Sequence, residues 1–263
     1  MSIDRVNGPD DPRIADYASV PDAELVRRHG LFVAEGRLVV RRLIEEGRYR
    51  VRSMLLSEAA LRGLRPIVTR VDAPIYVCDN ESLRRITGYN VHRGCLALAE
   101  RPEPVAPTDV LAAARTVVIL EAVANPDNVG GVFRNAAAFG FDGVLLNPTC
   151  CDPLYRKAIR TSMAATLRVP YATLDGWPDA LVEIRRLGFT IVALTPRLPA
   201  VDLAVFAADR RPDRFALLIG SEGEGLSAGA ERHADCRVRI PISDTVDSLN
   251  LAVAAAIAMD RLR

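Results

Sequence analysis

The sequence is poor in the residues that build metal sites and disulfide frameworks. Its 263 residues include three histidines and an odd number of cysteines, and no two cysteines form a Cys-x-x-Cys pair. Structural zinc sites need closely spaced cysteine or histidine ligands, and a disulfide framework needs an even number of cysteines. We therefore expect no metal ion, and we expect reduced cysteines that are mostly small core residues. These are Cys78, Cys95, Cys150, Cys151 and Cys236.

Long apolar runs are also missing. The longest candidate, residues 249–259, is shorter than the roughly 18 residues that a membrane-spanning helix needs, and it contains Asn250. The first residues include Asp4, Asp10 and Asp11, and this acidic start lacks the basic-then-apolar order of a secretory signal. The sequence therefore predicts a cytoplasmic protein without a membrane segment.

Lysine is almost absent, because Lys157 is the single lysine among 34 basic residues. These are balanced by 33 acidic residues, and the net charge of +1 indicates no particular partner. The stretch from Leu25 to Arg52 differs, because eight arginines and three glutamates give it a local charge of +5. Two interpretations stay open: a solvated helix face with internal ion pairs, or a patch that contacts phosphate through charge and bidentate geometry.

A proline-rich stretch at residues 101–109 separates two patterned regions and is typical of a short linker. The first region alternates between helical and strand patterns, which predicts a small α/β domain. Its expected helices cover residues 36–46 and 82–86, and its expected strands cover 51–56, 75–78 and 95–99.

The second region has apolar strands separated by helices, which predicts a parallel sheet covered on both faces. The expected strands cover residues 116–120, 143–146, 189–194, 215–219 and 236–240. The expected helices include one that ends at residue 139, one at 179–187 and one at 248–262.

Chemistry-bearing residues follow the first of these strands. Asn128, Gly130, Gly131 and Arg134 occupy the predicted turn and the start of the next helix. Ligands bind at the carboxyl ends of strands in α/β proteins, and a helix start offers N–H groups to an anion. The glycines would permit close backbone approach, and Arg134, about one turn into the helix, could reach back to this mouth. The segment matches neither a dinucleotide fingerprint nor a P-loop.

Two further segments combine glycine or polar residues with strand ends. Gly220-Ser-Glu-Gly-Glu-Gly225 follows an apolar strand, and its glycines indicate either unusual backbone angles or a flexible surface turn. In the last segment, residues 240–259, we expect Asp247 or Ser248 to cap the helix. Asn250 is then a polar amide in an apolar helix, and we expect it to orient a loop or a substrate.

Together these segments resemble the SpoU (TrmH) family of RNA ribose 2′-O-methyltransferases, within the SPOUT superfamily. The family pattern Asn-x-Gly-x-x-x-Arg-x-Ala is similar to Asn128 through Ala136, and Gly-x-Glu-Gly-x-Gly is similar to Gly220 through Gly225. The third pattern, Ile-Pro followed by Ser-Leu-Asn, is similar to Ile240, Pro241 and Ser248 through Asn250.

The resemblance implies an α/β fold whose C-terminal domain, residues 111–263, is catalytic and contains a deep trefoil knot. Residues 1–104 would form a ribosomal-protein-like α/β domain that binds the RNA, and Phe32-Val-Ala-Glu-Gly36 is similar to its opening signature. The family implies S-adenosylmethionine as cofactor, rRNA or tRNA as partner, and a homodimer through the knotted domain.

Roles for single residues follow from the same resemblance. Catalytic roles fall to Asn128, Arg134, Glu222, Ser248 and Asn250. Cofactor contacts fall to Gly220, Ile240 and Leu249. The RNA contacts are expected instead from the arginine-rich stretch, at Arg37, Arg41 and Arg42. Arg134 would handle the ribose proton or, because a guanidinium stays protonated, would clamp phosphate and stabilise a developing alkoxide. Two alternatives remain, namely an RNA-binding protein of this fold without catalysis and a SPOUT base methyltransferase.

The sequence departs from the family pattern at a few positions. Asp244 and Thr245 stand where glycine is frequent, Ala252 stands where serine is frequent, and Ala164 follows Arg160-Thr-Ser-Met where glycine is common. We expect these departures to change the shape of the cofactor loop and the substrate preference rather than the class of reaction.

Overall fold

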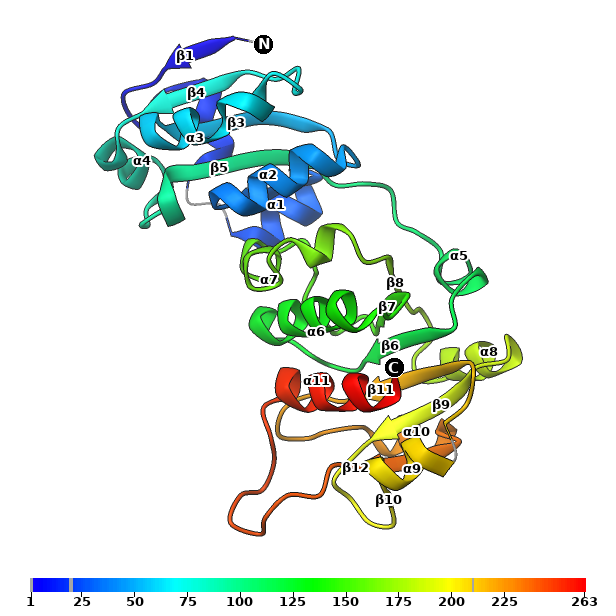
Figure 1. Cartoon of the computed structure of the whole chain (residues 1–263). Coiled ribbons are helices and arrows are strands. Elements are labelled where there is room, and N and C mark those ends of the chain that lie inside the picture. The colour runs from blue at the N-terminus through cyan, green and yellow to red at the C-terminus, as the bar shows by residue number, and fades with distance from the viewer. Residues whose placement is uncertain (1, 19–20, 210) are drawn as a thin grey trace. The chain divides into compact units, whose positions relative to one another are not determined.

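The chain forms two compact units. The computed structural model describes residues 2–18, 21–209 and 211–263. Unit 1 comprises Met1–Glu103 and Asp152–Leu167, and unit 2 comprises Pro104–Cys151 and Arg168–Arg263 (Figure 1). The sequence placed one boundary at residues 101–109, whereas the chain passes between the units at three points. The inclusion of residues 152–167 in unit 1 was not foreseen.

Unit 1 is built on a mixed five-stranded sheet with the order β1-β4-β3-β5-β2. Strands β1, β4 and β3 are parallel to one another, and β5 runs antiparallel to β3 and β2. The strands are β1 (Ile3–Arg5), β2 (Leu31–Glu35), β3 (Val51–Ser57), β4 (Ile75–Cys78) and β5 (Cys95–Glu100). The three predicted strands of this region are confirmed within two residues; β1 and β2 were not predicted.

The helices of unit 1 include both that the sequence predicted. They are α1 (Asp22–Arg28), α2 (Arg37–Glu46), α3 (Glu58–Val68), α4 (Asn80–Thr87) and α7 (Arg156–Thr161), with short 3₁₀ turns η1 (Pro12–Tyr17), η2 (His92–Gly94) and η3 (Ala165–Leu167). Helix α3 was missed, because Gly63 and Pro66 inside it are residues that usually interrupt helices. Pro66 lies two residues before the end of α3, and its missing N–H removes one hydrogen bond, to the carbonyl of Arg62, from the last turn of this helix.

Unit 2 contains the predicted parallel sheet. Its strand order is β10-β12-β9-β11-β6-β7-β8, and every neighbouring pair is parallel. The strands are β6 (Thr116–Leu120), β7 (Gly143–Leu146), β8 (Tyr171–Thr173), β9 (Thr190–Leu194), β10 (Val201–Asp202), β11 (Phe215–Ile219) and β12 (Cys236–Arg239). The short strands β8 and β10 carry too few apolar residues to show a pattern, and the sequence did not predict them.

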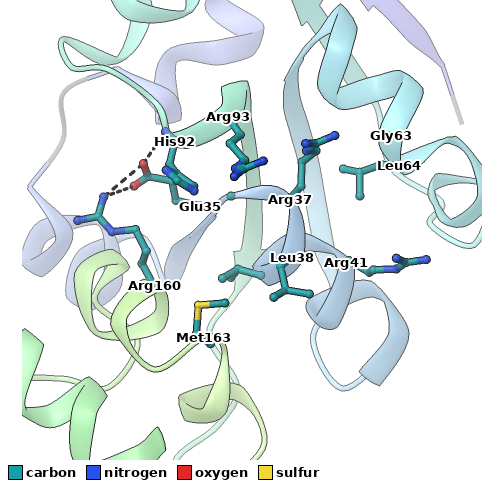
Figure 2. Close-up of a pocket in the computed structure, with 12 residues that line it drawn as sticks. Glu35, Arg37, Leu38, Arg41, Gly63, Leu64, His92, Arg93, Arg160 and Met163 are labelled. Atoms are coloured by element: carbon teal, nitrogen blue, oxygen red, sulfur yellow. Dashed lines mark hydrogen bonds and ion pairs between the residues drawn. The ribbon is translucent and has the colours of Figure 1, made fainter. Parts of the chain in front are cut away.

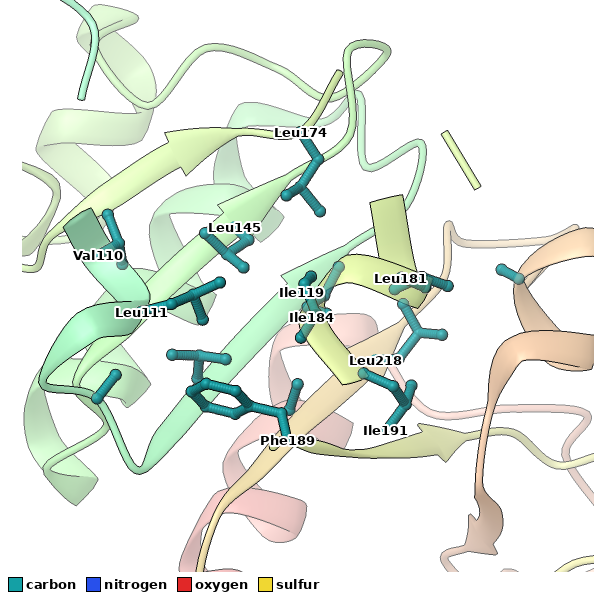
Figure 3. Packing of buried hydrophobic residues seen from close by; sticks show 14 of the residues in the cluster. Val110, Leu111, Ile119, Leu145, Leu174, Leu181, Ile184, Phe189, Ile191 and Leu218 are labelled. Carbon is teal, nitrogen blue, oxygen red and sulfur yellow. The ribbon is translucent and has the colours of Figure 1, made fainter. Parts of the chain in front are cut away.

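Helices cover this sheet on its faces. They are α5 (Pro107–Ala112), α6 (Pro126–Phe139), α8 (Ala180–Arg186), α9 (Leu203–Asp209), α10 (Ala228–His233) and α11 (Leu251–Leu262). On one face, residues of α5, α8 and α10 pack against strand residues such as Ile119, Ile191 and Leu218, all fully or almost fully buried (Figure 3). Because strand side chains alternate between faces, the remaining residues of β6 and β11 face the opposite helices.

This arrangement positions the site. The loops that follow β6, β9, β11 and β12 all leave the sheet at its carboxyl edge, because these strands are parallel. The three motif segments follow β6, β11 and β12, so they meet at this edge. Within the described ranges, no helix has the length and apolar character needed to cross a bilayer.

Candidate active site

A cavity of about 490 Å³ lies at the carboxyl ends of β9, β11 and β12. Its walls are the loops after these strands and the beginning of α11. All three predicted cofactor contacts line it, namely Gly220, Ile240 and Leu249, together with Glu222 and Ser248. The volume falls within the roughly 300–1,000 Å³ of small-molecule sites. Sequence reasoning missed the wall formed by the loop after β9.

The glycine-rich segment after β11 is a tight turn. A Cβ atom on Gly220 would lie 2.2 Å from the backbone carbon of Gly225, so no other residue fits. The Gly225 N–H donates to the carbonyl of Ser221 (3.1 Å), and Gly223 and Gly225 have φ angles of 90° and 71°. These contacts favour the prediction of unusual backbone angles over the alternative of a flexible surface turn.

Two side chains outside the motifs hold this turn. Arg197 donates to the carbonyls of Glu224 (2.5 Å) and Leu226 (2.9 Å). Glu121, which is 5% exposed, accepts hydrogen bonds from Trp177 Nε1 (2.7 Å) and from the backbone N–H of Ser227 (2.9 Å). Sequence reasoning missed Glu121, although a carboxylate directly after the apolar strand at 116–120 was the available signal.

The amide of Asn250 connects the three motifs. Its Nδ2 donates to Glu222 Oε1 (2.9 Å) and to Asn128 Oδ1 (3.2 Å). Asn128 is buried on α6, and Glu222 also accepts from the backbone N–H of Leu251 (3.4 Å). The structure thus brings together three of the five predicted catalytic residues, and Ser248 lines the adjoining cavity.

The start of the last helix differs from the prediction. We expected Asp247 or Ser248 to cap it, but α11 begins at Leu251 and Asn250 is its N-cap, with Oδ1 accepting from the N–H of Val253 (3.2 Å). The prediction was wrong because several residues before the helix carry capping side chains. Asn250 caps α11 because its side chain is held at the helix start by Glu222 and Asn128.

The glycines of the first motif also lie elsewhere than predicted. Asn125 caps α6, which begins at Pro126, so Gly130 and Gly131 are inside the helix rather than in a turn. A Cβ atom on Gly131 would lie 2.6 Å from the Cβ of Ala252. Gly131 therefore permits α6 to approach α11 closely. Asn135 strengthens this contact, because its Nδ2 donates to the carbonyl of Ala252 (2.7 Å).

Arg134 is exposed on α6, eight residues after Pro126 and so more than two turns into the helix, not one as predicted. In the part of the chain that the structure describes, no hydrogen bond or ion pair joins it to another residue. It lies one turn after Gly131, on the side of α6 near α11. Its guanidinium is therefore available to a ligand.

The predicted RNA contacts lie in unit 1, on α2, in three different environments. Arg37 lines a cavity at the helix start, and Arg41 pairs with Glu45 at 3.0 Å. Arg42 donates to the backbone carbonyl of Met163. Arg41 thus fits the interpretation of a helix face with internal ion pairs, and Arg42 supports the segment 152–167.

The departure at Ala164 has a visible backbone consequence. Met163 and Ala164 both have left-handed φ angles, 53° and 68°, and Ala164 is fully buried. Glycine adopts this region without the steric penalty that a Cβ brings. Ala164, at the position where glycine is common in the family, therefore adopts the left-handed backbone conformation that favours glycine.

The cysteines are free thiols. Burial raises the pKa of Cys78, Cys150 and Cys236 to about 11 and that of Cys95 to about 12. These four stay protonated at neutral pH and are not poised as nucleophiles.

Comparison with known proteins identifies the family. The profile of the SpoU rRNA Methylase family matches residues 115–260. An uncharacterized tRNA/rRNA methyltransferase of Mycobacterium tuberculosis is 40% identical over 263 residues, which cover 98% of this chain and 91% of that protein. The 23S rRNA (guanosine(2553)-2′-O)-methyltransferase RlmP of Bacillus subtilis is 30% identical over 190 residues, 72% of each chain.

Solved structures share the fold over almost the whole chain. A TrmH-family protein from Porphyromonas gingivalis has a TM-score of 0.79 and 27% identity, covering 95% of this chain and 96% of its own. An AdoMet-bound rRNA methyltransferase from Sinorhizobium meliloti has a TM-score of 0.81 and 23% identity, covering 99% and 97%. The matching profile spans more than half of the chain, and the mycobacterial relative spans nearly all of it. The chain therefore belongs to the SpoU family of RNA methyltransferases.

Proposed function

We propose that the chain transfers a methyl group from S-adenosylmethionine to a ribose 2′-hydroxyl of a structured RNA, ribosomal RNA in preference to transfer RNA. The observation that carries this proposal is the Asn250 amide, which joins Glu222 and Asn128 beside the cavity. The Bacillus subtilis relative, named as a 23S rRNA 2′-O-methyltransferase, supports the choice of ribose and of ribosomal RNA.

The residues around the unit 2 cavity fit S-adenosylmethionine. Gly220 leaves open the space that a Cβ atom would occupy, and Ile240 and Leu249 supply apolar contacts. Backbone groups of the strand-end loops can bind a nucleoside without a dedicated acid. We assign Gly220, Ile240 and Leu249 as the residues that hold the cofactor.

The protein's part in the reaction is mainly to position the substrate. S-adenosylmethionine, when bound, supplies an electrophilic methyl group on a sulfonium leaving group. The ribose oxygen must then approach in line with this methyl group, and orientation of this kind lowers the barrier strongly. Hydrogen bonds connect the side chains of Asn128, Glu222 and Asn250. They hold the turn after β11 next to the start of α11, and the ribose would enter between these two segments. Ser248 lies beside this group.

Arg134 clamps the RNA phosphate next to the target ribose and stabilises negative charge on its 2′-oxygen. A free guanidinium is essentially always protonated, so it is a poor base but a strong electrostatic partner. The exposure of Arg134 and its lack of a partner among the described residues support this role.

The wider organisation follows the same proposal. Unit 1 binds the RNA, and unit 2 carries out the reaction. The proposal includes a trefoil knot in unit 2. It is supported by the path of the chain, which comes back at Asn250 to contact the Ser221–Gly225 turn and then continues as α11, which packs on α6. We include a homodimer through unit 2, where Val253 of α11 is 49% exposed. Sedimentation equilibrium should then give twice the mass of the chain.

The test is a methylation assay on unmodified 23S rRNA and on tRNA, both transcribed in vitro, with S-adenosylmethionine carrying a labelled methyl group. Digestion to nucleosides should give a 2′-O-methylnucleoside. A labelled base would favour the alternative of a SPOUT base methyltransferase. Binding of RNA without binding of the cofactor would favour a noncatalytic RNA-binding protein. Mapping ribose methylation in cells with and without the gene then identifies the nucleotide.

A further inference from the structure

Unit 1 contains a second cavity, of about 450 Å³, that is rich in arginine. It lies round the start of α2, and residues of α3, η2 and the segment 152–167 complete its walls (Figure 2). Four arginines line it, namely Arg37, Arg41, Arg93 and Arg160. Among the described residues, Glu35 is the acidic side chain in this lining.

Two of these arginines are free to bind a ligand. Arg37 and Arg93 make no hydrogen bond or ion pair with any side chain in the described ranges. The backbone of Arg93 is left-handed, with φ 56° and ψ 25°, a conformation that disfavours a residue with a Cβ. Residues in sparsely populated backbone conformations cluster at ligand-binding and active sites.

Glu35 organises the cavity and does not neutralise it. Its side chain is 1% exposed and lies 3.5 Å from both Arg156 and Arg160. Its Oε1 also accepts the backbone N–H of His92 (2.9 Å), so it fixes the turn that carries Arg93. Two guanidinium groups share this one buried carboxylate. The charges of Arg37 and Arg93 therefore remain uncompensated in the cavity.

The backbone adds to the positive potential. Gly36, with a φ of 97°, precedes the ten-residue helix α2, and no side chain in the described part of the chain caps this helix. Gly36, Arg37, Leu38 and Val39 line the cavity, so the first N–H groups of α2 lie at its wall. Such N–H groups and the helix dipole favour an anion.

We propose that this cavity binds a phosphate of the RNA backbone, with Arg37 and Arg93 as its direct ligands and Glu35 and Arg160 as positioning residues. The inference rests on the proposed function, in which RNA is the substrate. Exposed Leu38 and His92 beside the arginines suit the sugar and base that accompany a phosphate in RNA. The site shares Arg37 and Arg41 with the predicted patch and adds Arg93 and Arg160 from other segments, whereas Arg42 of that patch is bound to the Met163 carbonyl.

The test compares two double variants in binding to unmodified 23S rRNA transcribed in vitro. Arg37→Ala/Arg93→Ala removes both proposed ligands and leaves the pairing of Glu35 intact. Arg70→Ala/Arg84→Ala removes the same charge from exposed positions of unit 1 that do not line the cavity. Each phosphate contact contributes about 0.7 to 0.9 to the slope of log affinity against log salt. The cavity variant should flatten this slope by about 1.4 to 1.8, and the control should leave it nearly unchanged.

Additional variants separate the proposal from a folding defect. Arg93→Gly removes the side chain but suits the left-handed backbone, and it should flatten the slope by about 0.7 to 0.9. Arg37→Lys/Arg93→Lys should retain the slope while RNA affinity falls, because lysine lacks the bidentate fork. Binding of S-adenosylmethionine, measured by calorimetry, should stay unchanged in all of them.

The outcomes are distinct. Equal slopes for the cavity variant and the control would overturn the phosphate site while leaving the proposed reaction standing. RNA binding that depends on Arg37 and Arg93, without methyl transfer by the unmodified chain, would support the site and contradict the proposed reaction. A chain that binds no RNA would overturn both.

Discussion

Asn250 performs two tasks that substitution can separate. Its Oδ1 caps α11 through the N–H of Val253, whereas its Nδ2 holds Glu222 and Asn128. A side chain that keeps the accepting oxygen but lacks the donating N–H group should still cap α11. It can no longer donate hydrogen bonds to Glu222 and Asn128, so the connection between the motifs is lost. Under the proposed function, methyl transfer depends on the second task.

We therefore predict that Asn250→Asp lowers methyl transfer at least tenfold, the rate equivalent of about 1.4 kcal/mol. Aspartate caps helices as well as asparagine does, but its carboxylate would face Glu222. The two carboxylates would repel each other, so the variant should also unfold at a lower temperature than the unsubstituted chain. Thermal unfolding measures this, with Asn250→Ala, which loses the cap as well, for comparison.

Arg134 is the second residue whose role is open to direct test. Arg134→Ala should lower the rate of methyl transfer by roughly 10²- to 10³-fold while calorimetry shows unchanged binding of the cofactor. Arg134→Lys should fail too, because an ammonium group lacks the planar fork. Arg232→Ala, at an exposed position of α10, is the matched control. Near-normal turnover of the lysine variant would contradict an arginine-specific role.

At the residue level, sequence reasoning found the groups with recognisable chemistry and missed those that hold them. Gly220, Ile240 and Leu249 could be placed at one cavity because motif order and parallel strands bring them to one edge. Glu121 could not, because its partners Trp177 and Ser227 come from distant parts of the chain. Hydrogen bonds between distant residues leave no periodic signal in the sequence.

Among the elements, the pair α6 and α11 sets the geometry of the site. The helices approach closely because residue 131 has no side chain opposite Ala252. Their packing holds Asn128 of α6 and Asn250 at the start of α11 within hydrogen-bond distance.

We predict that Gly131→Ala destabilises the protein by about 1–3 kcal/mol, because the added methyl group would lie 2.6 Å from the Cβ of Ala252. Combining it with Ala252→Gly should restore most of the stability, since the methyl group only changes sides and the helix propensities offset each other. Chemical denaturation of both single variants and the double variant measures the coupling. If the losses of unfolding free energy in the two single variants simply add in the double variant, the contact between residues 131 and 252 does not set the distance between α6 and α11.

Elements with a strong apolar pattern were predictable, and those defined by partners were not. The strands β6, β7 and β11 match their predicted residues because apolar runs bounded by turns are unambiguous. The strand β8 has three residues and exists because β7 pairs with it. Helix α7 was not predicted, and its packing within unit 1 depends on residues about 120 positions away in the sequence, such as Glu35.

For the whole molecule, the interleaving of the two units has a consequence for proteolysis. Residues 101–106 contain no helix or strand and are mostly exposed, so we expect a protease to cut there first. The two pieces should nevertheless stay together in gel filtration. Residues 152–167 of the second piece still contact the first, where Asp152 pairs with Arg101 (2.6 Å) and Arg160 with Glu35.

A variant with Glu35→Ala tests the cause, because it removes the carboxylate that Arg156 and Arg160 share. Its nicked pieces should separate at lower salt or denaturant concentration than those of the unsubstituted chain. Pieces of the unsubstituted chain that separate as soon as residues 101–106 are cut would contradict this account.

The same crossings set an order for synthesis on the ribosome. Unit 1 lacks α7 and both arginine partners of Glu35 until residue 160 has been added, and by then β6, α6 and β7 have already been made. Until that moment Glu35 lacks both guanidinium partners, and the helix that packs on its strand β2 has not been made. Completion of the first unit must therefore follow the start of the second, so this chain does not fold simply domain by domain from its N-terminus.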